Sequence, residues 1–272
     1  MLKLIILSVF VLGGAACSKQ AAALRQSTGG AQCKVHFNSP ADAAHTDLLV
    51  YSDKGTRPLL RHFRSESGDI ELPVPQEDLV LAAIANLPGE LNTAVLGTLD
   101  RLEHISMPYS RENPELPVMS GMRLAEAGSE RLEMALTPLL CTVSITGIDS
   151  RLERRLEEPQ LYLKGASSEA GIFRSDGFHP SGLLDSAEGL ECPGMMLSNL
   201  PVDLGINSVD LGFRLFCYPN DDPFPGTRIC IGGSIDGELK EYSAPLGPLS
   251  RAEKLKYRID LGPSAMTLEP VP

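Results

Sequence analysis

The chain has 272 residues, and its 24 Lys and Arg against 35 Asp and Glu give a net charge of −11 at pH 7. An acidic surface of this size repels nucleic acid and anionic lipid headgroups, so the composition argues against proteins that bind either of them directly. The 25 glycines and 21 prolines are spread along the chain, which is typical of an all-β protein made of many short strands joined by turns.

The first predicted element is a bacterial export signal in residues 1–16. Lys3 is followed by an apolar run at 4–12 and then by small residues that end at Ala16. This pattern is typical of a secretory signal, and the run is too short to span a bilayer, which needs about 20 apolar residues. Cys17 follows directly, so we expect the signal to be removed and Cys17 to become the lipid attachment site.

One residue departs from the bacterial lipoprotein pattern, because Gly14 stands where that pattern usually has an aliphatic residue. The alternative is ordinary secretory cleavage after Ala16 or within 21–23, with Cys17 incidental. Ser18 follows the cysteine, whereas retention in the inner membrane is usually marked by an acidic residue there. We therefore expect a lipid anchor in the outer membrane.

Residues 17–32 form the next predicted element, a flexible tether. They have no apolar period and are rich in Ala, Gln, Ser and Gly. Strand patterns follow at Val35 and Phe37, at 48–51, and at Ile70, Leu72 and Val74.

Two later segments of this half carry patterns that also fit helices. Residues 79–87 are apolar and fit either a helix or a buried strand, but Pro75 and Pro88 bound them at strand length. A short helix is predicted further on, because apolar residues recur every three positions with charged residues between them: Leu96, Leu99, Leu102 and Ile105.

A boundary between two domains is predicted at Pro138. The alternating apolar residues of 132–136 form a closing strand, and Pro138 ends it because proline cannot donate a ladder hydrogen bond. The apolar run at 139–148 then opens a new segment. We expect an N-terminal domain over 33–137 and a C-terminal domain over 138–272.

The second half repeats the pattern of short strands and turns. The charged run at 151–158 has Leu152 and Leu156 at helical spacing, so we predict one or two solvated helical turns there. Strand patterns lie at 161–163, 172–173, 195–197, 209–218, 229–235 and 257–261.

Five cysteines remain after the signal is removed and Cys17 is set aside, an odd number that cannot pair completely within one chain. Cys217 and Cys230 lie on apolar runs either side of 218–226, which predicts a hairpin. Ile229 and Ile231 are expected to face the core, so the residue between them points to the other face and a disulfide is disfavoured. We favour buried free thiols at Cys33, Cys141, Cys192, Cys217 and Cys230.

The sequence contains no pattern typical of a catalytic, metal or cofactor site. It has no Cys-x-x-Cys, and no two of its five histidines are three to five residues apart. Asp221 and Asp222 lack the alternating ligands and turn glycine of a calcium loop. Residues 232–237 (GGSIDG) superficially resemble a nucleophile elbow, but the second glycine is one place too far and no helical pattern follows, so a tight β-turn explains these glycines better. We expect no enzymatic activity and no cofactor.

Several stretches of the chain carry a resemblance to one family through their order and spacing. They are the signal ending at Cys17, 47–55 (DLLVYSDKG), 81–88 (LAAIANLP), 117–121 (PVMSG), 136–148 (LTPLLCTVSITGI), 204–220 and 251–261. In these stretches the chain resembles the FimB-type fimbrial anchor family, the lipoproteins that hold type V pili in an outer membrane.

The resemblance implies two transthyretin-like Greek-key β-sandwich domains in tandem, with a few short helices and neither enzymatic activity nor a cofactor. It also implies that the partners are other fimbrial subunits, joined by donor-strand exchange, in which an extended segment fills a groove of the neighbour. The tail at 262–272 is short and contains three prolines. We expect it to donate poorly unless it straightens over 265–268.

Cleavage after a tether arginine distinguishes two roles within this family, and Arg25 is the candidate for such an arginine in this chain. Stalk and tip subunits share the architecture but are cut after an arginine in the tether, which frees them from the lipid and opens the groove. Arg25 lies closer to Cys17 than we expect for a stalk subunit, so we favour a retained anchor. The alternatives are a stalk or tip fimbrillin released by cleavage after Arg25, and an arginine that is simply a charge in the tether.

Two further classes of function compete with the fimbrial one. A surface binding lipoprotein of the same fold, such as a glycan or nutrient receptor, is compatible with a β-sandwich, which hosts many functions. The absence of Trp and the presence of only 8 Phe and 6 Tyr count against a glycan receptor. A secreted hydrolase is the least favoured class because no catalytic set is found.

Overall fold

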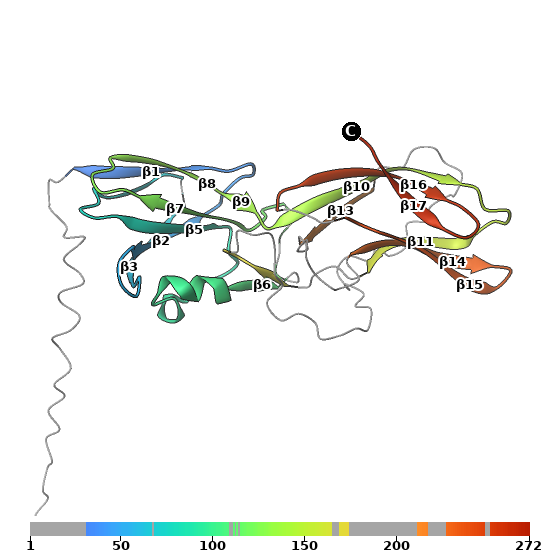
Figure 1. The fold of residues 1–272 in the computed structure, drawn as a ribbon, viewed down its shortest axis with the longest axis horizontal. Helices are drawn as coiled ribbons and strands as arrows, with labels where there is room; N and C mark the ends of the chain where they lie inside the picture. The colour runs from blue at the N-terminus through green and yellow to red at the C-terminus, as the bar shows by residue number, and fades with distance from the viewer. Residues whose placement is uncertain are drawn as a thin grey trace, which may run out of the picture.

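The computed structural model describes residues 31–272 apart from 67, 109, 110, 112, 114, 165–168, 174–210, 217–226 and 248–250. The described chain is mostly strand, with short 3-10 helices, which confirms the all-β prediction. In Figure 1 the strands form two groups that lie end to end along the long axis, with the blue-to-green strands in one group and the yellow-to-red strands in the other.

The N-terminal group consists of two sheets packed face to face. The smaller sheet has the strand order β4 (Ile70–Pro73), β1 (Gln32–Asn38), β8 (Arg131–Ala135). β1 runs antiparallel to β4 and parallel to β8. The larger sheet is antiparallel throughout, in the order β3 (Leu59–Ser65), β2 (Thr46–Ser52), β5 (Leu79–Ala85), β7 (Met119–Ala125), β9 (Thr137–Pro138).

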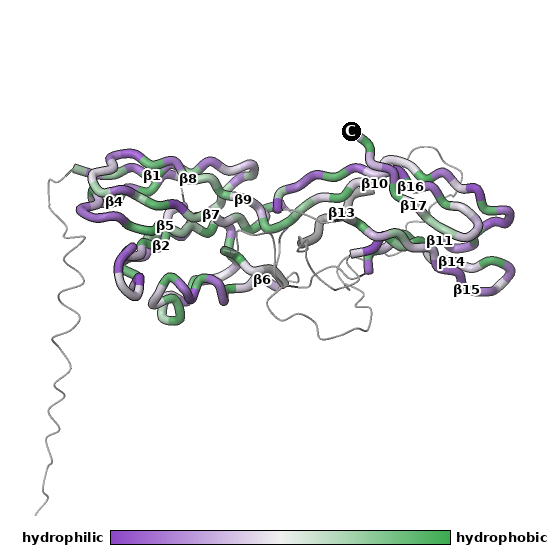
Figure 2. The backbone as a smooth tube through the Cα atoms, in the orientation of Figure 1, coloured by the Kyte–Doolittle hydropathy of each residue, from purple (hydrophilic) through white to green (hydrophobic). Residues whose placement is uncertain are grey.

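Alternating apolar residues fill the space between these two sheets and confirm the strands predicted near residues 35, 70 and 132. β2 and β5 are buried on both faces, because the larger sheet has a second covered face. This explains the unbroken apolar run at 79–87, which is a strand and is green along β5 in Figure 2. The core between the sheets includes Cys33, Val35, Leu72, Leu132 and Met134 opposite Leu48, Val50, Leu81, Ala83 and Met119.

The second face of the larger sheet is covered by two 3-10 helices, η2 (Thr93–Val95) and η3 (Leu99–His104). Leu96 and Leu102 are buried there in the same cluster as Leu49 and Ile84. The predicted short helix is therefore present, but as 3-10 turns. Apolar residues that recur every three positions match the three residues per turn of this helix type better than the 3.6 of an α-helix.

The C-terminal group also consists of two sheets. One has the order β13 (Leu211–Phe216), β10 (Leu140–Ser150), β16 (Lys254–Leu261), β17 (Met266–Pro270), with β10 parallel to β16 and the other pairs antiparallel. The other is antiparallel, in the order β11 (Glu157–Lys164), β14 (Arg228–Ile235), β15 (Glu238–Pro245). Their shared core includes Val143, Ile145 and Ile259 together with Leu161, Ile229 and Ile231.

The helical turns and the hairpin predicted for this half are absent from the described part of the structure. The run at 151–158 is not helical, because β11 begins at Glu157 and Leu156 is buried in the core against Gly233. The predicted hairpin between the Cys217 and Cys230 runs is also absent. β14 is already paired on both sides, with β11 and β15, while β13 pairs with β10.

The cysteines in the described part of the chain are buried and form no disulfide, as predicted for them: Cys33, Cys141 and Cys230. Cys230 lies opposite Tyr162 and Ser243 in the sheet register, whereas its neighbours Ile229 and Ile231 belong to the core. It therefore faces away from the core, as the pleat requires. Cys17, Cys192 and Cys217 lie outside the described residues.

The two groups of strands are joined by a short sheet and by a continuous core. β6 (Ser106–Pro108) pairs antiparallel with β12 (Glu169–Gly171). The apolar cluster that contains Tyr51 and Met107 of the first group continues into Leu139 and Ile172. Within the described ranges, no helix is long and apolar enough to cross a membrane.

Candidate functional site

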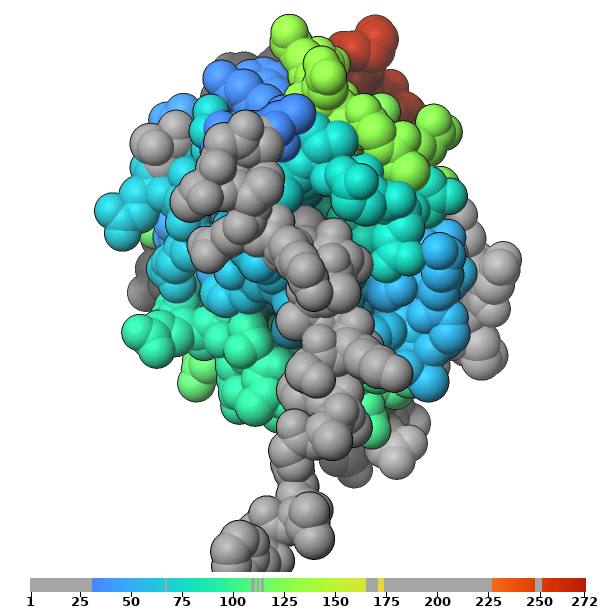
Figure 3. All heavy atoms as spheres, turned by 90° about the vertical axis from the view of Figure 1, so that its left-hand side faces the viewer, coloured from blue at the N-terminus to red at the C-terminus, as the bar shows by residue number. Residues whose placement is uncertain are grey.

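The two predicted site residues, Cys17 and Arg25, lie outside the described residues. The structure does show where the tether enters the fold, because β1 begins at Gln32 and is the central strand of its sheet. Figure 3 views this end of the molecule, where the blue residues of β1 lie beside the yellow-green residues that lead into β8. A pull along β1 acts on hydrogen bonds to both neighbours at once, since these bonds run across the strands.

Charged residues also hold β1 to the turn before β4. Lys34 Nζ lies 2.7 Å from Asp69 Oδ2, and His36 Nδ1 lies 2.7 Å from Asp69 Oδ1. Hydrogen bonds hold the pKa of the Asp69 carboxyl below its usual range. The bond from Lys34 has the largest effect, and the bond from His36 has the next largest. These pairs are exposed, so they orient the strand more than they stabilise it.

The C-terminal tail is extended and forms the edge strand β17. It pairs with β16 from Tyr257 opposite Pro270 to Leu261 opposite Met266. The Val271 amide continues the pairing by donating to the Lys256 carbonyl at 2.9 Å. The tail thus straightens, which is the condition under which we expected it to serve as a donor strand.

Arg251 lies at the junction of the two groups of strands and bridges several segments. Its Nη2 donates to Ser120 Oγ on β7 at 2.8 Å and to the Thr137 carbonyl on β9, while Nε donates to the Pro138 carbonyl at 3.4 Å. Its Nη1 donates to the Ile172 carbonyl just after β12 at 3.3 Å. One guanidinium group therefore links the loop before β16 to three other parts of the chain.

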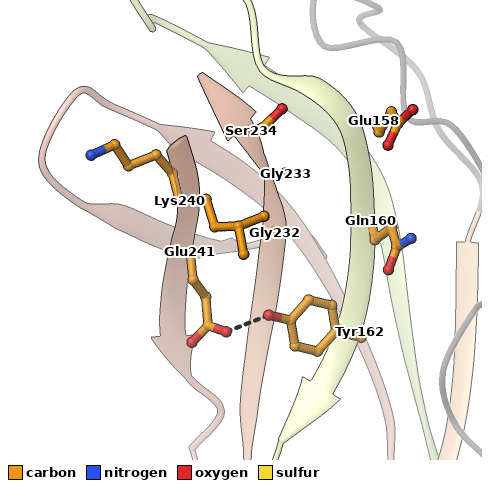
Figure 4. Close-up of a pocket in the computed structure, with 9 residues that line it drawn as sticks. Glu158, Gln160, Tyr162, Gly232, Gly233, Ser234, Lys240 and Glu241 are labelled. Atoms are coloured by element: carbon orange, nitrogen blue, oxygen red, sulfur yellow. Dashed lines mark hydrogen bonds between the residues drawn. The ribbon is translucent and has the colours of Figure 1, made fainter. Parts of the chain in front are cut away.

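A groove of about 400 Å³ lies on the outer face of the β11, β14, β15 sheet. Gly232 on the central strand pairs with Gln160 on one side and Glu241 on the other. Because Gly232 has no side chain, the Tyr162 side chain can lie close over it and reach Glu241. Figure 4 shows Tyr162 and Glu241 at one end of the groove and Ser234 toward the other.

The glycines at the floor of this groove are strand residues, so the predicted tight turn is wrong for Gly232 and Gly233. The turn that joins β14 to β15 is formed by Asp236 and Gly237, whose φ angles are 53° and 77°. Gly233 is required by packing, because a Cβ there would lie 2.7 Å from the Glu157 carbonyl oxygen. The three atoms nearest to a Cβ on Gly232 would all belong to the Tyr162 side chain, the first at 3.2 Å.

A hydrogen-bonded cluster covers Cys230 at the end of the groove. Tyr162 Oη donates to Glu241 Oε2, and Lys164 Nζ donates to the same oxygen at 2.5 Å. Burial raises the pKa of Glu241, but the hydrogen bonds from Lys164 and Tyr162 outweigh it and hold the pKa below its usual range. Burial, helped by the charge of Glu241, raises the pKa of the Cys230 thiol to about 11, so this thiol is protonated at neutral pH.

Three of the four histidines in the described part of the chain have structural partners. His36 contacts Asp69, His45 Nε2 lies 3.0 Å from the Leu87 carbonyl oxygen, and His62 Nε2 lies 2.7 Å from Oδ1 of the buried Asp47. No three His, Cys, Asp or Glu side chains among the described residues are grouped so that they could hold a metal ion.

Sequence reasoning missed Arg251 and the groove residues Gln160, Tyr162 and Glu241. Arg251 was noted only as part of the stretch 251–261 that resembles the fimbrial anchor family. Its neighbours in the sequence do not distinguish it from an ordinary charged residue at the surface. The residues that line the groove come from three strands that are neighbours only in the folded sheet. The two adjacent glycines within an apolar run were the one local signal.

No family model matches the sequence, and no curated protein matches it. Solved structures do share its fold. A candidate cell adhesion protein from Bacteroides eggerthii is 11% identical with a TM-score of 0.67, and the match covers 89% of this chain and 95% of that one. A fimbrilin from Porphyromonas gingivalis is 14% identical with a TM-score of 0.57, over 86% and 91% of the two chains. A fimbrial assembly protein from Parabacteroides distasonis is 13% identical with a TM-score of 0.57, over 88% and 95%.

Proposed function

We propose that this chain is a subunit of a bacterial fimbrium and that it is the lipid-anchored subunit that holds the fimbrium in the outer membrane. The observation that carries the proposal is a fimbrilin-like fold over nearly the whole described chain, preceded by a signal that ends at Cys17. A structural role in assembly also agrees with the solved structures reported above, which are described as fimbrial or adhesion proteins and not as enzymes.

The position of Arg25 relative to β1 supports an anchor over a released stalk or tip subunit. A stalk subunit must both lose its lipid and open a groove when it is cut. β1 begins at Gln32, so cleavage after Arg25 would leave every described strand in place. Such a cut would release the protein from its lipid without opening the N-terminal sheets. It would therefore meet only the first of the two requirements of a stalk subunit.

In this proposal the folded part of the chain consists of two transthyretin-like domains, 33–137 and 138–272. It assembles with other subunits by strand exchange. The C-terminal segment is the candidate for the exchanged strand. β17 is five residues long, lies at a sheet edge and has its single proline, Pro270, at its last position. An edge strand of this kind can leave its own sheet and pair with an edge of a neighbour.

Replacing Cys17 with alanine is expected to move the protein from the outer-membrane fraction to the soluble and medium fractions. The physical reason is that acyl chains contribute about 0.8 kcal/mol for each buried CH₂, and the acidic body has no electrostatic attraction to anionic lipid. Cell fractionation with immunodetection of this chain and of the fimbriae measures the change.

The matched control is Arg25→Ala, which changes the tether but keeps the cysteine. We expect it to leave the fraction unchanged and to change the mass of the mature protein only by the substitution itself. A Cys17→Ala protein that stays in the outer membrane would refute the lipid anchor. A natural mature protein whose mass lacks residues up to Arg25 would instead identify a released subunit.

A further inference from the structure

We propose that a groove at the junction of the two groups of strands binds an extended acidic segment of a partner protein. This junction groove has a volume of about 410 Å³ and is separate from the groove over Gly232. It is lined by the first residues of β10 and β16 and by loops of the N-terminal group, where β10 follows β9 (Figure 1). The proposal does not depend on the fimbrial role, because it rests only on the shape and charge of this surface.

One side of the junction groove is apolar and stiff. It is formed by residues shortly after β1, before β7 and in β9: Pro40, Ala41, Pro117 and Pro138. Leu140, the first residue of β10, continues this apolar surface. A proline ring fixes the backbone φ angle, so such a wall loses little conformational entropy when a ligand orders against it. This side therefore suits an apolar side chain of the ligand.

The other side of the junction groove carries hydroxyl and ammonium groups in a regular array. Thr142 lies beside Lys254 in the parallel register of β10 and β16, and two residues further along Ser144 lies beside Lys256. All four residues line the groove, whereas Val143, between the two hydroxyls, belongs to the core. Alternate residues of a strand share one face and are about 6.6 Å apart. Each lysine therefore stands beside a hydroxyl, and the two pairs repeat at this spacing.

The array carries positive charge in an otherwise acidic chain. The charged residues among those that line the groove are Lys254 and Lys256, whereas the whole chain has a net charge of −11. Neither lysine forms an ion pair with another residue in the described part of the chain. Arg258 is the next residue on this face of β16, but it is already paired with Asp149, with Nη2 2.8 Å from Oδ1. The two ammonium groups of the array therefore select a negatively charged ligand.

An extended peptide with acidic residues at alternate positions matches this array. Its side chains at positions i and i+2 lie on one face and are about 6.6 Å apart, which is the spacing of the two pairs. Asp or Glu at those positions would place one carboxylate at each pair, where the ammonium group supplies charge and the hydroxyl donates a hydrogen bond. An apolar residue next in the peptide would contact the proline side. Spacing and charge thus define the ligand together.

The test is fluorescence anisotropy on the full mature chain made soluble by Cys17→Ser. The probe is the capped peptide LVETETG, which carries an uncharged fluorophore and has its two glutamates at alternate positions. Its isomer LVEETTG has the same composition and charge but adjacent glutamates, and LVQTQTG has no glutamate. We expect saturable binding of the first peptide, at least fivefold weaker binding of the isomer and at least tenfold weaker binding of the neutral peptide.

The double variant Lys254→Gln, Lys256→Gln removes both ammonium groups and is expected to weaken binding of LVETETG at least tenfold. Both residues are exposed, so the core is unchanged. The matched control is Lys54→Gln, Lys240→Gln, which changes the net charge equally at exposed lysines outside the groove. Tetragalacturonate, which also carries spaced carboxylates, is titrated as a second ligand.

Four results would overturn the proposal. LVETETG may not fail to bind saturably, the isomer must not bind as tightly as LVETETG, and the groove variant must not bind as the control does. Tighter binding of tetragalacturonate than of LVETETG would assign the groove to an acidic polysaccharide instead of a peptide.

Discussion

Replacing Arg251 with methionine is expected to lower the free energy of unfolding by about 2–4 kcal/mol. A hydrogen bond to a charged group contributes about 1.5–3 kcal/mol, and this guanidinium group makes several such hydrogen bonds. Methionine keeps much of the side-chain volume but donates no hydrogen bond. It leaves Ser120 Oγ and three carbonyls without this donor, and Ser120 is 1% exposed, so water reaches it poorly. Arg251→Lys should fall in between, because one ammonium group cannot reproduce the planar fork of donors.

Urea unfolding of the soluble Cys17→Ser chain under reducing conditions measures this loss. Amide hydrogen exchange should also quicken near residues 120, 137 and 172, because these segments share the guanidinium. Arg151→Met is the matched control: Arg151 pairs with Asp260 at the surface, and its side chain is 71% exposed. The control should cost less than about 1 kcal/mol. Equal stability of the two variants, with unchanged exchange at 172, would contradict a role for Arg251 at the junction.

The junction matters for the proposed function because an anchor must transmit force from the filament to the lipid. Force that enters at β17 has to reach β1 through the contact between the two groups of strands. That contact combines the β6 and β12 pairing, a shared apolar cluster and Arg251. A side chain that ties β7, β9 and the end of β12 together resists bending and sliding, which an apolar contact alone resists less well, since it has no preferred direction.

The strands of the fold could be predicted from sequence where burial differs between their two faces. Leu132, Met134 and Leu136 alternate with polar residues, and β8 lies at that position. The partner of each strand could not be predicted in the same way. Cys217 and Cys230 lie on neighbouring apolar runs, yet β13 pairs with β10, more than sixty residues earlier in the chain. Pairing is decided by which sheet edge is free in the folded protein, and local pattern carries no information about this.

The candidate sites were predictable only in part, for a related reason. The prediction at Cys17 rests on a contiguous signal, because the enzymes that process such signals read local sequence. Tyr162, Gly232 and Glu241 are brought together only through the register of β11, β14 and β15. Arg251 likewise stands in a loop, and its acceptors on β7, on β9 and after β12 are known only once the sheets are placed.

Replacing Gly121 with alanine is expected to destabilise the N-terminal sheets by about 2–3 kcal/mol, near the upper part of the range for overpacking. A Cβ at Gly121 would lie 2.1 Å from the Ala135 carbonyl oxygen and 3.2 Å from the Ala135 carbonyl carbon. No real side chain tolerates the first distance, and the obstructing atoms are backbone, so a rotamer change cannot relieve the clash. Chemical unfolding and the protection of β8 amides measure the effect.

The reason for this close approach lies in the path of the chain between the two sheets. β8 belongs to the smaller sheet and β9 to the larger one, so the chain passes from one to the other between Ala135 and Thr137. It crosses directly over β7, where Ser120 pairs with Thr137. Gly97→Ala, which meets no atom within 4 Å, should change stability by less than about 0.5 kcal/mol. If Gly121→Ala were as stable as Gly97→Ala, the crossing would have to lie farther from β7, and the link between β9 and Arg251 would need a different geometry.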